Sequence, residues 1–185
     1  MRRFILITGL LLASPVVGLA QNNQDPHYRG EGYLFFGVGP AVVGVPEFIP
    51  SLGYSILNRR PVVEHAGFGG EAFLYKGLGL GAEVGYARWS TPGGFNEWAG
   101  IASADLSYHF PLKAAHSRLD PFVLGGYTLM FHHGSDSAGN FGGGLNLWIA
   151  KHAALRFEVR DETHSSLSPS GYRQILEFRV GLTFR

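Results

Sequence analysis

Charged side chains that can pair with one another stand at alternate positions along apolar stretches of this chain. In residues 152–161 arginine and glutamate alternate with leucine, phenylalanine and valine, and residues 174–185 repeat the pattern. Ionised groups held away from water are expensive unless they pair with opposite charges. The spacing therefore predicts a cluster of ion pairs in an enclosed space. The residues of this predicted cluster are Glu71, Glu83, Asp105, Arg156, Glu158, Arg160, Glu177 and Arg179.

The elements that would position these charges are β-strands, because a period of two sends alternate side chains to opposite faces of a strand. Gly125-Gly126 interrupts the alternation in one stretch and leaves its two faces ambiguous. Pro46, Pro50 and Pro61 assign residues 40–64 to a long loop, since proline is excluded from interior strands. The predicted strands are residues 30–39, 65–75, 78–88, 98–110, 121–131, 140–149, 152–161 and 174–185.

The length and the connections of these strands indicate how they are used. Strands of about ten residues are long enough to cross a bilayer at a tilt. Their connections alternate between longer loops and tight turns, and the three lysines of the chain, Lys76, Lys113 and Lys151, all stand in the tight connections. Short periplasmic turns and longer outer loops are typical of outer-membrane barrels. We therefore predict an all-β fold, an eight-stranded antiparallel up-and-down transmembrane β-barrel made by residues 30–185.

The N-terminus has the pattern of a secretory signal peptide. Arg2 and Arg3 precede a short apolar run, and Gly18 and Ala20 are the small residues that a signal peptidase accepts. We expect residues 1–20 to be removed before Gln21, with residues 21–29 as a periplasmic lead-in. Cleavage leaves 13 of the 15 basic residues against 14 acidic ones, so no basic excess predicts a nucleic-acid partner.

The alternation alone fits a soluble barrel of the lipocalin type as well as a membrane barrel, with the faces inverted. Three features favour the membrane barrel. No strand interior carries a lysine, and the less apolar face is rich in glycine, alanine and serine, which suits a narrow interior. Aromatic residues gather near the strand ends, as a membrane girdle requires. These residues are Tyr75, Tyr86, Trp89, Trp98, Tyr108, Phe110, Phe131, Trp148, Tyr172 and Phe184.

Together, the signal peptide, the strand rhythm and the closing pattern of residues 155–161 and 177–185 resemble the bacterial outer-membrane β-barrels related to the OmpA-type transmembrane domain. The resemblance implies a location in the cell outer membrane. It also implies outer-membrane lipid, lipopolysaccharide and the barrel assembly machinery as partners, a monomeric state and no cofactor.

One constellation points to an enzyme. His164 and Ser166, followed by Glu177, resemble the His-x-Ser and downstream glutamate of outer-membrane lipid A deacylases, in which serine is the nucleophile, histidine the base and glutamate the orienting group. Leu167 stands where that family has asparagine, and alternation turns Glu177 toward the lumen although lipid A lies outside. We therefore predict that the trio is not catalytic. His132 and His133 imply no metal site, since adjacent side chains diverge.

The charged lumen has two possible roles, a structural plug or a narrow ion path. Eight strands enclose an interior that side chains just fill, which favours the plug. The sequence thus predicts a non-enzymatic outer-membrane barrel that supports envelope integrity or presents surface loops. A small pore and a lipid A acyl hydrolase remain the alternatives.

Overall fold

The computed structural model describes the chain from residue 30 onward, apart from short connections. The predicted signal peptide and lead-in, residues 1–29, lie outside the described residues. Among the residues described, no helix is long and apolar enough to span a membrane. Side chains are described except at residues 43–49, 53–59, 96 and 172–173. The described ranges are 30–49, 53–59, 61–90, 96–110, 118–131, 135–164 and 172–185.

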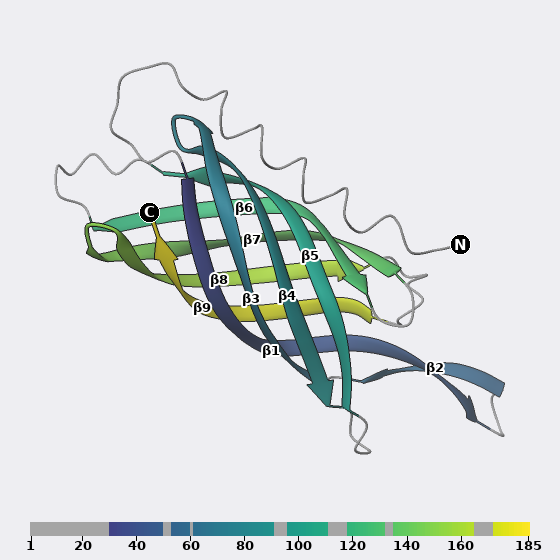
Figure 1. The fold of residues 1–185 in the computed structure, drawn as a ribbon. Helices are drawn as coiled ribbons and strands as arrows, with labels where there is room; N and C mark the ends of the chain where they lie inside the picture. The colour runs from purple at the N-terminus through teal and green to yellow at the C-terminus, as the bar shows by residue number, and fades with distance from the viewer. Residues whose placement is uncertain are drawn as a thin grey trace, which may run out of the picture.

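The strands form one antiparallel sheet that closes on itself, as Figure 1 shows. Each strand from β3 to β8 pairs with the next, β1 pairs with β3, and β1 also pairs with β9 to complete the ring. This confirms the predicted eight-stranded barrel. The strands are β1 (Gly30–Ile49), β2 (Gly53–Arg59), β3 (Val62–Tyr75), β4 (Leu78–Ser90), β5 (Asn96–His109), β6 (Leu119–Phe131), β7 (Ser135–Ala150), β8 (Ala153–His164) and β9 (Tyr172–Phe184).

The prediction of a loop at residues 40–64 was wrong. β1 continues to Ile49, and β2 turns back along it as an extra strand outside the closed ring. Pro46 lies within this hairpin, opposite Ile56. A two-stranded ribbon tolerates proline because residues on its open edge have no ladder hydrogen bond to lose. In Figure 1 this hairpin runs on past the barrel wall.

Several other strands extend further than predicted at the end of the barrel opposite the tight turns, which is called the outer end below. β7 begins at Ser135 instead of residue 140, and β8 runs to His164 instead of residue 161. The sequence loses its apolar alternation in these segments because they pass the apolar band. Ladder pairing with the neighbouring strand nevertheless keeps the backbone extended, for example between Ala138 and His164. The extension turns additional polar side chains into the barrel.

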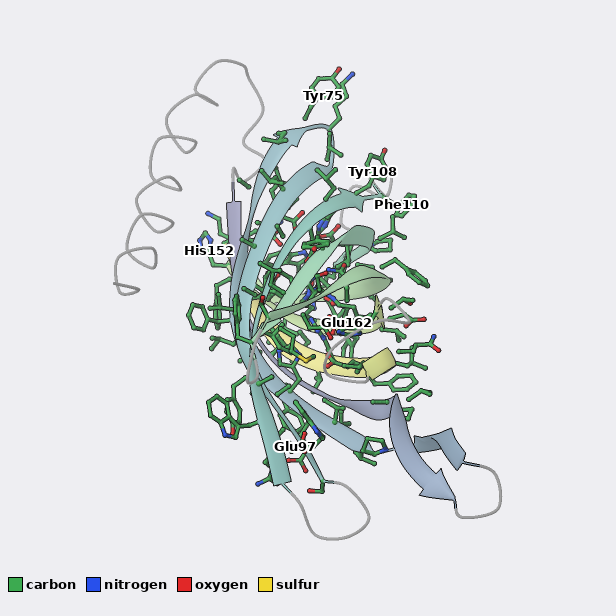
Figure 2. The ribbon with its side chains drawn as sticks, turned by 90° about the vertical axis from the view of Figure 1, so that its right-hand side faces the viewer. Tyr75, Glu97, Tyr108, Phe110, His152 and Glu162 are labelled. Atoms are coloured by element: carbon green, nitrogen blue, oxygen red, sulfur yellow. The ribbon has the colours of Figure 1, made fainter. Side chains whose placement is uncertain are left out.

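The two faces of the wall differ as the alternation predicts. Outward side chains such as Phe68, Val84 and Phe178 are 59%, 45% and 55% exposed, while the residues next to them along the strands are buried or half-buried. The ambiguous strand is settled: in β6, Phe122 and Leu124 point inward, and Val123 and Tyr127 point outward. The exposed apolar residues run around the barrel as a band, with side chains on both faces drawn in Figure 2.

Most of the predicted girdle residues lie on the outer face, but two tryptophans do not. Trp89 and Trp148 are only 2% and 7% exposed, so their assignment to the girdle was wrong. Both stand on the inward parity of their strands, where the lumen has space for a large ring. The side chain of Tyr172 lies outside the described residues. The girdle residues that are exposed are Tyr75, Tyr86, Trp98, Tyr108, Phe110, Phe131 and Phe184.

Glycines on the inward parity give the large luminal side chains room to lie against the wall. A Cβ atom added at Gly69 would stand 2.5 Å from the ring of Tyr33, and one at Gly67 would stand 2.7 Å from the ring of Phe35. Real Cβ contacts are essentially never this short, so a larger residue at either position of β3 would have to displace the ring of its neighbour on β1. The glycines therefore make possible the narrow, crowded interior that the sequence predicted.

Candidate functional site

The candidate site is the charge network in the middle of the lumen. The structure brings the predicted charges together there, except Glu71, which lies nearer the periplasmic end. They come from β4, β5, β8 and β9, and strand alternation turns each of them inward. The exposed fractions are 3% for Glu83, 4% for Asp105, 3% for Arg156, 5% for Glu158, 0% for Arg160, 0% for Glu177 and 5% for Arg179.

Arg160 on β8 joins two sides of the barrel. Its Nη1 atom lies 3.0 Å from Glu83 and 3.1 Å from Asp105, which face it from β4 and β5. Its Nε atom donates a 2.8 Å hydrogen bond to Glu158 on its own strand. The guanidinium group presents donors in a fixed fork, so one arginine can hold several carboxylates at once. Arg160 is therefore a cross-link through the lumen.

Arg179 on β9 makes a second cross-link. Its Nε atom donates to Glu177 at 2.6 Å and its Nη1 atom donates to Glu83 at 2.9 Å. Glu83 thus accepts from both central arginines. The guanidinium also lies 4.6 Å from the ring centroid of Phe35, a cation–π arrangement. Arg160 and Arg179 are held apart by the carboxylates that they share.

Arg156 pairs with a carboxylate of its own strand, β8. Its Nε and Nη2 atoms donate to Glu158 at 3.0 and 2.8 Å, two residues along the same strand. Glu177 instead contacts His65 at 3.2 Å as well as Arg179. The guanidinium of Arg156 is also sandwiched by rings, 4.5 Å from the centroid of Tyr33 and 4.0 Å from that of Phe122. Arg156 and Glu177 therefore belong to different parts of the network.

Sequence reasoning missed two members of the network. His65 is 1% exposed and lies 3.2 Å from both Glu177 and Arg179, but β3 was predicted to begin at that residue, so its face was not assigned. Glu162 is 0% exposed and lies 3.6 Å from Arg179. It was overlooked because β8 was predicted to end at residue 161. Extending the alternation by one more inward position would have found it.

Neutral hydrogen bonds extend the network. Tyr33 donates to Glu83 at 3.2 Å. Asn140 donates to Asp105 at 2.8 Å and to Thr128 at 2.9 Å. Ser103 lies 2.9 Å from the same threonine hydroxyl. These groups occupy lone pairs that the arginines leave open, as a buried polar network requires.

Glu71 belongs to a second polar cluster at the periplasmic end. The hydroxyl of Ser107 donates to Glu71, and the Nε2 atom of His109 lies 3.2 Å from it. The other ring nitrogen of His109 lies 2.9 Å from Asp120. Asn146 donates to Asp120 at 3.3 Å, which continues the chain of contacts across the barrel. Within the described part of the chain, no group of three or more acidic or histidine side chains is arranged to hold a metal ion.

An apolar layer occupies the outer end of the lumen, beyond the charges. It comes from β1, β3, β4, β5, β6 and β9 and is fully enclosed by them. Trp89 provides its largest ring and donates a 3.1 Å hydrogen bond from Nε1 to Glu97. The layer consists of Ala41, Val63, Ala87, Trp89, Ala99, Ile101, Met130 and Ile175, each at most 3% exposed.

The trio of His164, Ser166 and Glu177, which the sequence predicted not to be catalytic, is described only in part. His164 is the last residue of β8, whereas Glu177 lies opposite Arg160 in the ladder. That is four residues nearer the periplasm, or about 13 Å along the strand. The carboxylate of Glu177 is already engaged by Arg179. Ser166, like His132 and His133, lies outside the described residues.

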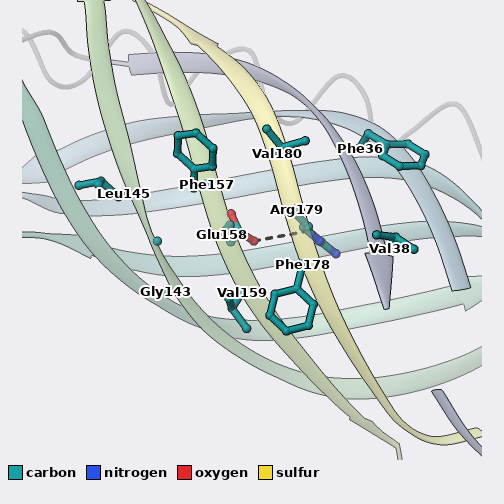
Figure 3. A pocket seen from close by; sticks show the side chains of 11 residues that line it. Phe36, Val38, Gly143, Leu145, Phe157, Glu158, Val159, Phe178, Arg179 and Val180 are labelled. Carbon is teal, nitrogen blue, oxygen red and sulfur yellow. Dashed lines mark ion pairs between the residues drawn. The ribbon is translucent and has the colours of Figure 1, made fainter. Parts of the chain in front are cut away.

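The outer wall carries a groove with a volume of about 610 Å³ across β1, β9, β8 and β7. Figure 3 shows that the outward side chains of the groove are apolar, including Phe36, Phe157 and Phe178. Glu158 and Arg179 point to the opposite face of the wall, into the lumen. Strand alternation explains this separation. The groove lies in the apolar band, so acyl chains are what it would meet in a membrane.

The wall and its closure place the chain among known barrels. No protein-family model and no curated protein matches it. Solved structures do. The N-terminal β-barrel domain of Pseudomonas aeruginosa OprF has a TM-score of 0.52 and 14% identity, over 84% of this chain and 98% of that one. Outer membrane protein OprG of Pseudomonas aeruginosa has a TM-score of 0.57 and 11% identity, over 85% and 96%.

Neisserial surface protein A is a third similar structure, with a TM-score of 0.56 and 11% identity over 83% of this chain and 96% of that one. The chain has the fold of the bacterial outer-membrane β-barrels. The predicted resemblance to OmpA-type barrels is thereby confirmed at the level of the fold. The same likenesses support the predicted outer-membrane location.

Proposed function

We propose that this protein is a non-enzymatic outer-membrane barrel with a closed lumen, which contributes to the integrity of the cell envelope. The observation that carries the proposal is the filled interior. Arg160 and Arg179 cross-link the barrel wall in the middle of the lumen, and the apolar layer around Trp89 packs beyond them at the outer end. An ion crossing this path would have to displace paired charges and then pass an apolar layer.

Single-channel recording of the purified protein in a planar bilayer tests this proposal. We expect no steady conductance at any holding potential. The small pore is the second candidate, and a steady conductance would establish it. Insertion must be verified in the same sample by heat-modifiable migration on a gel, so that a silent bilayer reports a closed barrel and not an empty one.

The enzymatic alternative has its own test. Cells that express the protein should show the same lipid A mass spectrum as cells that express the Ser166→Ala variant and as cells without either. Loss of an acyl chain with the wild type alone would establish a lipid A hydrolase.

The expected partners are outer-membrane lipid and lipopolysaccharide around the barrel and the barrel assembly machinery during insertion. We expect a monomer and no cofactor or nucleic acid.

The hairpin of β1 and β2 favours a second role at the cell surface. It continues the wall beyond the closed ring, with seven residue pairs from Val43–Arg59 to Ile49–Gly53. Its sequence is largely apolar, with Val45, Phe48 and Ile56 among its residues. Such a ribbon is suited to presenting a surface for interaction. Deletion of residues 44–58 should leave barrel folding intact while abolishing any binding that depends on this surface.

A further inference from the structure

Exposed basic side chains gather at the periplasmic rim of the barrel. Lys76 forms the β3–β4 turn, Lys151 and His152 form the β7–β8 turn, and Arg118 immediately precedes β6. All four are exposed. The up-and-down order of the strands brings these connections to one end, and the shortness of the turns marks that end as periplasmic.

Interfacial aromatic side chains surround the first of these charges. Tyr75 and Tyr108 are 65% and 40% exposed, and Phe110 is 44% exposed. The Nζ atom of Lys76 lies 4.9 Å from the ring centroid of Tyr75. The rings of Tyr108 and Phe110 meet edge to face at 5.1 Å. Figure 2 shows these three aromatic residues at one end of the barrel, opposite Glu97. The rim therefore offers an ammonium group and phenol donors above an apolar surface.

The second group of charges stands over a similar apolar border. The carbonyl of Arg118 accepts a 2.8 Å hydrogen bond from the backbone of Trp148, which places it beside the end of β7 that leads to Lys151. Ile149 and Leu119 nearby are 55% and 44% exposed on the outer face. Cations directly above an apolar band lie at the depth of lipid headgroups.

The opposite rim has a different charge. There Arg88 is already paired with Glu64 at 2.9 Å, and Asp136 and Asp161 add negative charge. At the periplasmic rim the described carboxylates are less exposed than Glu64: Glu31 and Glu71 are each 8% exposed, and the side chain of Asp120 is 22% exposed. Among the described residues the two membrane borders therefore differ in charge, and the exposed lysines that could meet an anion stand at the periplasmic border.

We propose that the periplasmic rim binds the phosphodiester headgroups of anionic phospholipids in the inner leaflet of the membrane. The inference rests on the proposed membrane location. Basic residues at a membrane surface each contribute about 1 kcal/mol of attraction to anionic lipid, which is about fivefold in affinity. Tyrosine hydroxyls at the same depth donate hydrogen bonds to the headgroup. Lipid A carries phosphate as well, but it meets the other rim, where Arg88 is neutralised.

Native mass spectrometry of the full-length mature protein in detergent provides the test. Phosphatidylglycerol, phosphatidylcholine and lipid A are added separately, and the fraction of protein with bound lipid gives three affinities. We expect wild type to prefer phosphatidylglycerol several-fold over phosphatidylcholine, in a way that weakens with salt. The double variant Lys76→Gln/Lys151→Gln should lose about 25-fold in phosphatidylglycerol affinity if the two contributions add and keep its phosphatidylcholine affinity.

The matched control is Arg88→Gln, which removes a positive charge at the opposite rim. It should leave phosphatidylglycerol binding unchanged. Equal affinities of wild type for phosphatidylglycerol and phosphatidylcholine, or an equal loss in Arg88→Gln, would overturn the proposal, as would lipid A binding that the double variant abolishes instead. Failure of wild type to insert into vesicles at all would refute the membrane location itself, which is a distinguishable result.

Discussion

Replacing Arg160 with methionine is the most direct perturbation of the luminal network. The change removes three contacts, to Glu83 at 3.0 Å, Asp105 at 3.1 Å and Glu158 at 2.8 Å. The partner side chains are at most 5% exposed, so water cannot replace the lost guanidinium. Breaking a buried pair by removing one partner costs about 3–5 kcal/mol, because it leaves uncompensated charge behind. We expect the free energy of unfolding to fall by that amount.

The double-mutant cycle with Asp105→Asn separates pairing from simple loss of volume. Asp105→Asn alone leaves Arg160 with two carboxylates, so its cost should be smaller, about 1–3 kcal/mol. The double variant should be less destabilised than the sum of the two, by about 0.5–3 kcal/mol, because removing both partners leaves less unpaired charge. Guanidinium unfolding from lipid vesicles, followed by tryptophan fluorescence, measures all four proteins.

The chain supplies a matched control for this cycle. Arg88 and Glu64 also meet at 2.9 Å, but their side chains are 53% and 48% exposed. Exposed ion pairs contribute only about 0–1 kcal/mol. Arg88→Met should therefore change stability little. If Arg160→Met is no worse than Arg88→Met, or if the effects of Arg160→Met and Asp105→Asn simply add, the lumen is wet enough to screen its charges and the reasoning fails.

Three further predictions concern the wall, the outer layer and the N-terminus. Val180 is 48% exposed and lies between Phe36 and Phe157 in the ladder. Val180→Arg should therefore cost about 2–4 kcal/mol in the free energy of refolding into vesicles, against about 0–1 kcal/mol for Phe184→Arg at the strand end. Equal costs would contradict the assigned membrane depth. Trp89→Ala should lower the free energy of unfolding by about 3–5 kcal/mol and should produce channel openings in a planar bilayer. Trp98→Ala, at a position 56% exposed on the outer face, should produce no openings. If the Trp89→Ala barrel is also silent, the apolar layer does not close the lumen. N-terminal sequencing of protein from the membrane fraction should begin at Gln21, and retention of Met1 would refute cleavage.

The sequence predicted most of the barrel because period-two alternation is a local property. The outward Leu80 and Val84, and the inward Glu83 between them, can be assigned from the order of residues alone, and the structure confirms each. The strand segments that the alternation did not predict lie beyond the end of the outer apolar band. Residues 135–139 and 162–164 lack the apolar contrast, so their strands were cut short and Glu162 was lost from the predicted network. The β1–β2 hairpin was missed because Pro46 counted against a strand, although a two-stranded ribbon accepts it.

The pairing of the luminal charges was beyond sequence reasoning for a different physical reason. Which strands are neighbours follows from chain order, and this gives the ladder that sets Arg160 opposite Glu177. Glu158 and Arg179, which are opposite in that ladder, do lie 3.6 Å apart, but the other ion pairs of the two central arginines do not follow it. Arg160 reaches across the lumen to Glu83 and Asp105, on strands that are not its neighbours, because the interior is narrow and glycines leave its walls thin. In a closed barrel the inward side chains form a three-dimensional packing problem. Alternation therefore decides which residues enter the lumen, whereas side-chain length and the positions of the glycines decide which of them meet.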